Sequence, residues 1–155
     1  MLSDDMATKK ARTTRTTDLC YSLATRQFSR LLGRIYQKHL DPVSISAGDF
    51  AIMEFLSQNS EMTMNDLAGE LVMERTTLVR TLKPLQAKGL VVTKPDPTEP
   101  RRLFISLTSL GEAKRQEALP HWAMAQGEVE QLIGKSVAEQ LRNGIDTALK
   151  ANRHS

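Results

Sequence analysis

The chain has 155 residues, which is enough for one domain with a hydrophobic core and additional helices. Apolar residues make up 40% of it, yet no run approaches the roughly 20 apolar residues of a membrane span. A single cysteine, Cys20, excludes an intramolecular disulfide, and the net charge of +3 does not by itself indicate nucleic-acid binding.

The N-terminal segment, residues 1–16, is polar and predicts a disordered basic arm. Lysines and arginines are scattered here among threonines and alanines. The arm either reaches the phosphates of a nucleic acid or is simply solvated. The apolar segment of a secretory signal is missing, so we expect a cytoplasmic protein without membrane contact.

Two helices are predicted next. Apolar residues recur at helical spacing from residue 17 to Leu40, and Pro42 ends this helix. A second helix begins at Ser46, which forms a capping-box pair with Asp49. It ends near residues 59–60.

A short third helix and a longer fourth helix follow. Thr63 and Asp66 repeat the capping signal, and a turn at Val72 leads into a helix over 74–88. Gly89 supplies the left-handed residue that commonly ends a helix.

The helix over 74–88 has two different faces. Leu78, Leu82 and Leu85 fall within a narrow arc that anchors the helix to a core. The opposite face carries hydroxyl and basic side chains, and no acidic residue follows Glu74. Side chains of these types contact base edges and phosphates in the major groove of DNA. A solvated charged face would look the same, but the preceding helix and turn and the basic hairpin that follows favour DNA.

Pro84 is unexpected inside this helix. It removes the hydrogen bond that the Arg80 carbonyl would accept, which predicts a kink or an inserted water. The alternative is that the helix ends near Lys83, which would leave Leu85 without a role.

A β-hairpin is predicted after Gly89. Residues 90–93 and 103–107 are rich in β-branched and apolar residues, and the turn between them holds two prolines. Lys94 and the pair Arg101–Arg102 make the tip of the hairpin basic.

Two more helices complete the chain. The first begins at Thr108 or Ser109, with Glu112 as the capping partner of Ser109, and should kink near Pro120. An amphipathic helix is predicted over 136–150. The fold class is therefore mainly α with a small β-hairpin wing: a winged helix-turn-helix flanked by N- and C-terminal helices.

From residue 17 onward the sequence resembles the MarR family of transcriptional regulators. The resemblance is carried by MTMNDLAGELVMERTTLVRTLKPLQAKGLVVTKPDPTEPRRLFISLTSLGEA. It implies a DNA-binding domain over 46–107 between dimerisation helices at 17–45 and 108–152. It also implies a homodimer, most often a repressor, that binds double-stranded DNA at a pseudo-palindromic operator. Val72 departs from the pattern, since relatives often have glycine in this turn.

The resemblance also assigns the DNA contacts. In the family a wing arginine enters the minor groove and an acidic residue orients it; the matching positions are Arg101 and Glu99, with Asp96 opening the turn. Residues 75–77 and Arg80 match a subgroup with an RTTL start. The predicted DNA contacts are Thr63, Arg75, Thr76, Thr77, Arg80, Lys83, Lys94, Arg101 and Arg102.

Most family members release DNA when a small, often aromatic and anionic, ligand binds between the dimerisation and DNA-binding regions. Arg26, Arg30 and Arg34 recur on one face of the first helix and either attract such an anion or form solvated or intersubunit ion pairs. The predicted pocket residues are Arg26, Arg30, Tyr36, His39, Met53 and Trp122, with Met124 as a further candidate; methionine and tryptophan are also common in plain cores.

Cys20 supports an alternative. Some relatives sense peroxides through a cysteine in this region with tyrosine neighbours, and here Tyr21 follows Cys20. A helix N-terminus lowers the pKa of a thiol, which favours its oxidation. A free cysteine is also a common core residue.

Three other classes of protein have less support. An enzyme using Cys20 with His39 or His121 as nucleophile and base lacks any local signature. A metal sensor would need ligand spacing that Cys20 and the histidines do not have. A winged helix used only for protein contacts would not need an acid-free basic helix together with Arg101. We therefore predict no catalysis, cofactor or metal.

Overall fold

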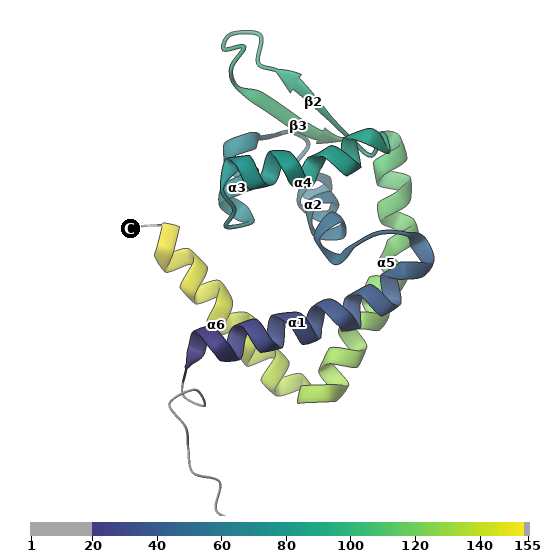
Figure 1. Ribbon diagram of the computed structural model, residues 1–155, viewed down its shortest axis with the longest axis vertical. Helices are drawn as coiled ribbons and strands as arrows, with labels where there is room; N and C mark the ends of the chain where they lie inside the picture. The colour runs from purple at the N-terminus through teal and green to yellow at the C-terminus, as the bar shows by residue number, and fades with distance from the viewer. Residues whose placement is uncertain (1–19, 154–155) are drawn as a thin grey trace, which may run out of the picture.

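The computed structural model describes residues 20–153, and the expectations for the basic arm and for residues 17–19 lie outside this range. The chain is mainly helical with one small antiparallel sheet, so the predicted fold class is confirmed (Figure 1). The elements are α1 (Tyr21–Leu40), the 3-10 turn η2 (Asp41–Val43), α2 (Ala47–Gln58), β1 (Met62–Thr63), α3 (Met64–Glu70), α4 (Arg75–Ala87), β2 (Val91–Pro95), β3 (Leu103–Leu107), α5 (Ser109–Ile133) and α6 (Lys135–Arg153).

The helix starts follow from local capping. The Ser46 hydroxyl accepts a hydrogen bond from the Asp49 amide at 3.0 Å, and the Ser46 amide donates to the Asp49 carboxylate at 3.4 Å. This confirms the predicted capping box of α2. At α5 the cap is Thr108, whose hydroxyl accepts from the Gly111 amide at 2.9 Å. The expected pairing of Ser109 with Glu112 is wrong, because the Glu112 carboxylate binds Arg115 instead.

The sheet has the strand order β1-β3-β2, with both neighbouring pairs antiparallel. Its hairpin, β2 and β3, is the predicted wing, and β2 extends two residues beyond the expected end at Thr93. Strand β1 was not predicted, since two residues are too short to show an alternating pattern. It pairs Met62 with Ile105, which ties the start of α3 to the wing.

One main core lies under the helix-turn-helix. Leu78, Leu82 and Leu85 of α4 are almost fully buried in it, as their shared arc predicted. A smaller cluster of Ile35 and Val129 with their neighbours joins α1 to α5. Helix α5 runs from the hairpin to the opposite end of the molecule, where α1 and α6 lie (Figure 1). Among residues 20–153, no helix combines the length and apolar character that crossing a membrane requires.

Both prolines inside helices are accommodated. Helix α4 continues through Pro84 to Ala87, so the alternative in which it ends at Lys83 is wrong. Helix α5 is likewise unbroken at Pro120. Gly89, with φ of +69°, ends α4 in the predicted left-handed conformation.

The turn before α4 places a β-branched residue in an unfavourable backbone conformation. Val72 has φ of +52° and its side chain is 63% exposed, so it has little packing to offset the strain. A left-handed conformation costs an L-residue about 1–2 kcal/mol, more than glycine loses in backbone entropy on folding.

We therefore expect Val72→Gly to raise the free energy of unfolding by about 0.5–1 kcal/mol, measured by urea denaturation. Thr147→Gly is the control, because Thr147 is also β-branched and exposed but lies in α6. The control variant should have a lower free energy of unfolding than the wild-type protein. A decrease in both variants would contradict backbone strain at Val72.

Candidate nucleic-acid interface and ligand cavity

Helix α4 presents the predicted basic face to solvent. Arg75, Thr76, Arg80 and Lys83 are exposed, and Thr77 is half-buried beside the leucines that anchor the helix. Within residues 20–153, no acidic side chain forms an ion pair with Arg75, Arg80 or Lys83. Their positive charges are therefore available to a polyanion.

The wing turn is organised by Asp96, which is buried. Its carboxylate accepts hydrogen bonds from the Thr98 amide at 2.8 Å and the Thr98 hydroxyl at 2.7 Å. The hydroxyl bond is the main reason why the pKa of Asp96 lies below its usual value. The carboxylate therefore stays ionised at neutral pH and fixes the turn.

The acidic residue that positions an arginine in this wing is Asp96 rather than Glu99. Asp96 lies 3.9 Å from the Arg102 guanidinium, which also stacks over the Phe104 ring at 5.3 Å. The expected pair between Glu99 and Arg101 does not form in the part of the chain that is described, and both side chains are exposed. Arg101 is therefore exposed in the wing turn and forms no ion pair among residues 20–153.

Thr63 does not present its hydroxyl to DNA as expected. Its side chain is buried, caps α3 by accepting from the Asp66 amide at 3.1 Å, and donates to the Asp66 carboxylate at 2.6 Å. The capping role that the sequence indicated is confirmed, and it occupies the hydroxyl. Lys94, by contrast, is exposed on β2.

Helix α4 and the wing meet around one polar hollow of about 380 Å³. Arg75 comes from α4, Asn65 from α3, and Arg101 and Arg102 from the wing. The guanidinium of Arg75 donates to the Asn65 side-chain carbonyl at 3.5 Å. A helix with an exposed basic face beside a basic hairpin can place the helix in a major groove and the hairpin in the adjacent minor groove.

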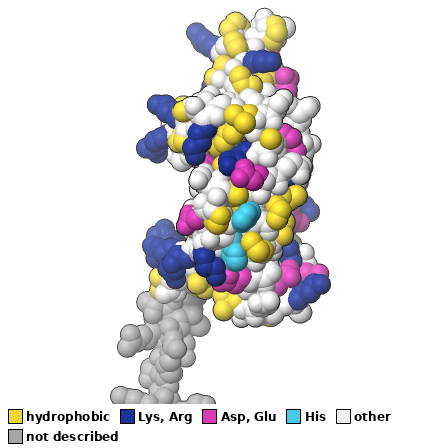
Figure 2. All heavy atoms as spheres, turned by 90° about the vertical axis from the view of Figure 1, so that its right-hand side faces the viewer, with side chains coloured by type: hydrophobic (Ala, Val, Ile, Leu, Met, Phe, Trp, Pro, Cys, Tyr) yellow, Lys and Arg dark blue, Asp and Glu magenta, His cyan; other side chains and the backbone are white. Residues whose placement is uncertain are grey.

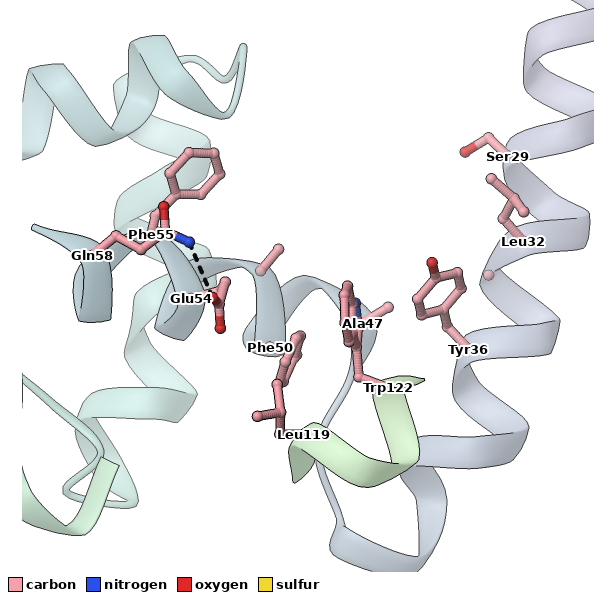
Figure 3. Close-up of a pocket in the computed structure, with 12 residues that line it drawn as sticks. Ser29, Leu32, Tyr36, Ala47, Phe50, Glu54, Phe55, Gln58, Leu119 and Trp122 are labelled. Atoms are coloured by element: carbon pink, nitrogen blue, oxygen red, sulfur yellow. Dashed lines mark hydrogen bonds between the residues drawn. The ribbon is translucent and has the colours of Figure 1, made fainter. Parts of the chain in front are cut away.

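A second hollow, of about 650 Å³, lies between α1, α2 and α5 (Figure 3). Tyr36 and Trp122 line it, as predicted, and the Trp122 ring stacks on Phe50 with the ring centroids 5.8 Å apart. Burial raises the pKa of Tyr36, so its hydroxyl keeps its proton and donates to Gln126 at 2.6 Å. The lining residues are Ser29, Leu32, Gly33, Tyr36, Ala47, Phe50, Ala51, Glu54, Phe55, Gln58, Leu119 and Trp122.

Four predicted pocket residues do not line this cavity. Arg26 and Arg30 are exposed on a neighbouring face of α1, and Met53 is fully buried in the core. His39 contacts Glu128 at 2.7 Å, and Lys38 contacts the same carboxylate at 2.6 Å. Met124 is exposed and also lies outside the lining. The cavity therefore has no cationic side chain in its wall, contrary to the expectation of an anion site.

Cys20 is exposed at the N-terminus of α1, where its sulfur accepts a hydrogen bond from the Leu23 amide at 3.5 Å. Tyr21 beside it is 88% exposed. Within residues 20–153, His, Cys, Asp and Glu do not gather into a group of three or more suited to a metal ion.

Comparisons with known proteins agree with this geometry. Residues 45–111 match a winged helix DNA-binding domain. The transcriptional regulator MosR of M. tuberculosis, solved in a complex with DNA, is 32% identical, with a TM-score of 0.73 over 86% of this chain and 98% of that chain. CouR of Rhodococcus jostii RHA1, solved on a 23-mer DNA duplex, is 20% identical with a TM-score of 0.76 over 88% of this chain and 99% of that chain, and supports the fold alone.

The matched curated relatives are also transcriptional regulators, not enzymes. The organic hydroperoxide resistance regulator of Bacillus subtilis is 26% identical over 65% of this chain and 67% of its own length. The regulator FarR of Neisseria gonorrhoeae is 27% identical over 62% of this chain and 66% of its own length. The chain therefore spans about two thirds of the length of these two relatives. The identity with MosR over nearly its whole chain, the winged helix match and the basic α4 surface beside the wing lead to one assignment. The protein belongs to the MarR family of DNA-binding transcriptional regulators.

Proposed function

We propose that the protein is a cytoplasmic repressor that binds a pseudo-palindromic operator as a homodimer and releases it when a small aromatic ligand enters the cavity. The observation that carries this proposal is the position of the cavity. It lies between α1 and α5, which belong to the flanking helices, and α2 of the DNA-binding domain. A ligand there contacts both parts of the molecule and can favour one arrangement of them over another.

The homodimer is supported by apolar side chains that one chain leaves uncovered, and Figure 2 shows exposed side chains of this kind on one face of the molecule. Leu132, Val137 and Ile145, at the end of α5 and along α6, are each at least half exposed. Burial of this face against a second copy removes it from water, as dimerisation in this family does. A two-fold axis then presents two α4 helices to half-sites about one DNA turn apart.

Trp122 provides the test, because it is the only tryptophan of the chain and it lines the cavity. The operator is identified first, by recovering the duplexes that the protein binds from a random pool. The complex with this operator should contain two chains per duplex. Compounds that change the Trp122 fluorescence should release this operator. Replacing Ala51, on the cavity wall, by phenylalanine should weaken that response. Compounds that alter the fluorescence at saturation and leave the operator bound contradict ligand-induced release.

Oxidation of Cys20 is the second candidate, favoured by its exposed sulfur at the start of α1. An organic hydroperoxide should then release the operator from the wild-type protein and not from Cys20→Ser. Unchanged affinity with Cys20 shown to be oxidised by mass spectrometry would exclude this mechanism.

A further inference from the structure

The wall of the cavity carries one charged side chain, Glu54 of α2. The other lining residues are apolar or aromatic, apart from two uncharged polar side chains, Ser29 and Gln58. Glu54 is 35% exposed, and in Figure 3 its carboxylate lies between Gln58 and Phe50. One carboxylate oxygen accepts from the Gln58 amide at 3.0 Å.

The other carboxylate oxygen of Glu54 accepts a hydrogen bond from Arg115, which also binds Glu112. The Arg115 guanidinium of α5 lies 2.9 Å from Glu54, and it donates two hydrogen bonds to Glu112, at 2.9 and 3.0 Å. These bonds lower the pKa of Glu112 to about 2, so Glu112 remains ionised at neutral pH. One guanidinium therefore faces two carboxylates, and the group of Glu54, Arg115 and Glu112 keeps one net negative charge beside the cavity.

Aromatic rings form much of the remaining wall. Tyr36, Phe50, Phe55 and Trp122 come from α1, α2 and α5 (Figure 3). The faces of such rings carry partial negative charge and attract organic cations. Arg26 and Arg30, which the sequence offered as candidates for attracting an anion, lie outside the lining.

We propose that the effector of this cavity is an aromatic organic cation, such as a protonated aryl amine, whose ring lies among the four aromatic side chains and whose charge lies beside Glu54. This inference rests on the proposed function and names the class of ligand that the cavity takes. The rings and the residual negative charge both favour a cation, and an anion would be repelled by Glu54.

The same carboxylate connects the cavity to the DNA-binding surface. A cation beside Glu54 competes with Arg115, which holds Glu112 in the first turn of α5. That turn is fixed to the junction of α4 and β2, because the Thr108 hydroxyl donates to the Gly89 carbonyl at 2.6 Å. Release of Arg115 thus acts on the point where α4 ends and the wing begins.

Three ligands with one ring system test the charge. They are 1-naphthylmethylamine, which is protonated at pH 7, the uncharged 1-naphthalenemethanol, and the anionic 1-naphthoate. Calorimetric titration of the full chain should give the tightest binding for the amine, about tenfold tighter than for the alcohol, and the weakest for the carboxylate. In Glu54→Gln the amine should lose most of this preference, whereas Glu61→Gln, which changes an exposed glutamate outside the cavity, should retain it.

Each outcome decides the inference. Binding of the naphthoate as tight as that of the amine, or an unchanged preference in Glu54→Gln, overturns it. If the alcohol or the naphthoate then releases the operator, ligand-induced release still holds, but the effector is not a cation. If none of the three ligands binds, this cavity is not an aromatic ligand site and both proposals fail. A loss of folding in Glu54→Gln is recognised from its thermal melt, and Glu54→Asp then replaces it, with a reduced preference expected.

Discussion

Replacement of Gly111 by alanine is expected to lower the free energy of unfolding by about 3 kcal/mol or more, the range of severe overpacking in a core. A Cβ atom at this position would lie 2.0 Å from the Leu90 carbonyl oxygen and 2.8 Å from a methyl group of Leu107. The first contact is with backbone, so no side-chain rotation relieves it. Helix α5 would have to move away from the segment that joins α4 to β2.

Gly127→Ala is the matched control, because Gly127 lies in the same helix and a Cβ there meets nothing within 4 Å. Alanine should stabilise that helix by up to about 1 kcal/mol. Urea denaturation followed by circular dichroism measures both variants. Equal stabilities would show that α5 does not pack on Leu90 as closely as the structure places it. A Gly111→Ala protein that folds but binds DNA weakly would show that this contact also positions the wing.

The parts of the fold that depend on neighbouring residues could be predicted from the sequence. The Ser46 capping box, the left-handed Gly89 and the buried arc of Leu78, Leu82 and Leu85 each follow from residues within one or two helical turns. Strand β1 could not be predicted, because it exists only through pairing with β3 more than 40 residues away.

The DNA-binding surface could be predicted from nearby residues, whereas the cavity depends on contacts between distant helices. The basic face of α4 follows from helical periodicity alone, since one side of the helix must face the core. The position of the cavity depends on which side of α1 meets α2, and helical periodicity does not show this. Arg26 and Arg30, for which an anion site was one of two interpretations, lie outside the lining. Besides the predicted Tyr36, helix α1 contributes Ser29, Leu32 and Gly33 to the lining, and not Arg30. Glu54 had no distinguishing pattern in α2 and became a candidate only through its contact with Arg115.

In the wing, an acidic residue lies beside an arginine as the family resemblance implied, but both residues differ from the expected ones. Glu99 was expected to orient Arg101, whereas Asp96 is the buried carboxylate and lies beside Arg102. The turn brings the Thr98 amide and hydroxyl onto Asp96, which places this carboxylate where the turn begins and leaves Glu99 exposed farther along the turn. The acid that fixes the wing is therefore the one that the turn buries.

Arg80→Ala is expected to weaken binding to the selected operator by about 1–3 kcal/mol for each half-site. Arg80 is exposed near the middle of α4, on the side opposite the buried leucines, and no acidic residue neutralises it among residues 20–153. If its guanidinium binds a base edge, the variant should also lose base preference at one position in each half-site. Fluorescence anisotropy on the operator and on single-base variants of it measures both effects.

Two variants distinguish this contact from a general loss of charge. Arg26→Ala removes the same charge from α1, so it should leave the affinity and the base preference nearly unchanged. Arg101→Ala should weaken binding through the minor groove, and its effect should depend on the width of that groove in A·T-rich duplexes. Wild-type affinity in both Arg80→Ala and Arg101→Ala would contradict the docking of α4 and the wing. If Arg80→Ala loses affinity equally for all sequences and the salt dependence becomes shallower, Arg80 contacts phosphate, and the base reading must come from the Arg75–Thr77 end of the helix.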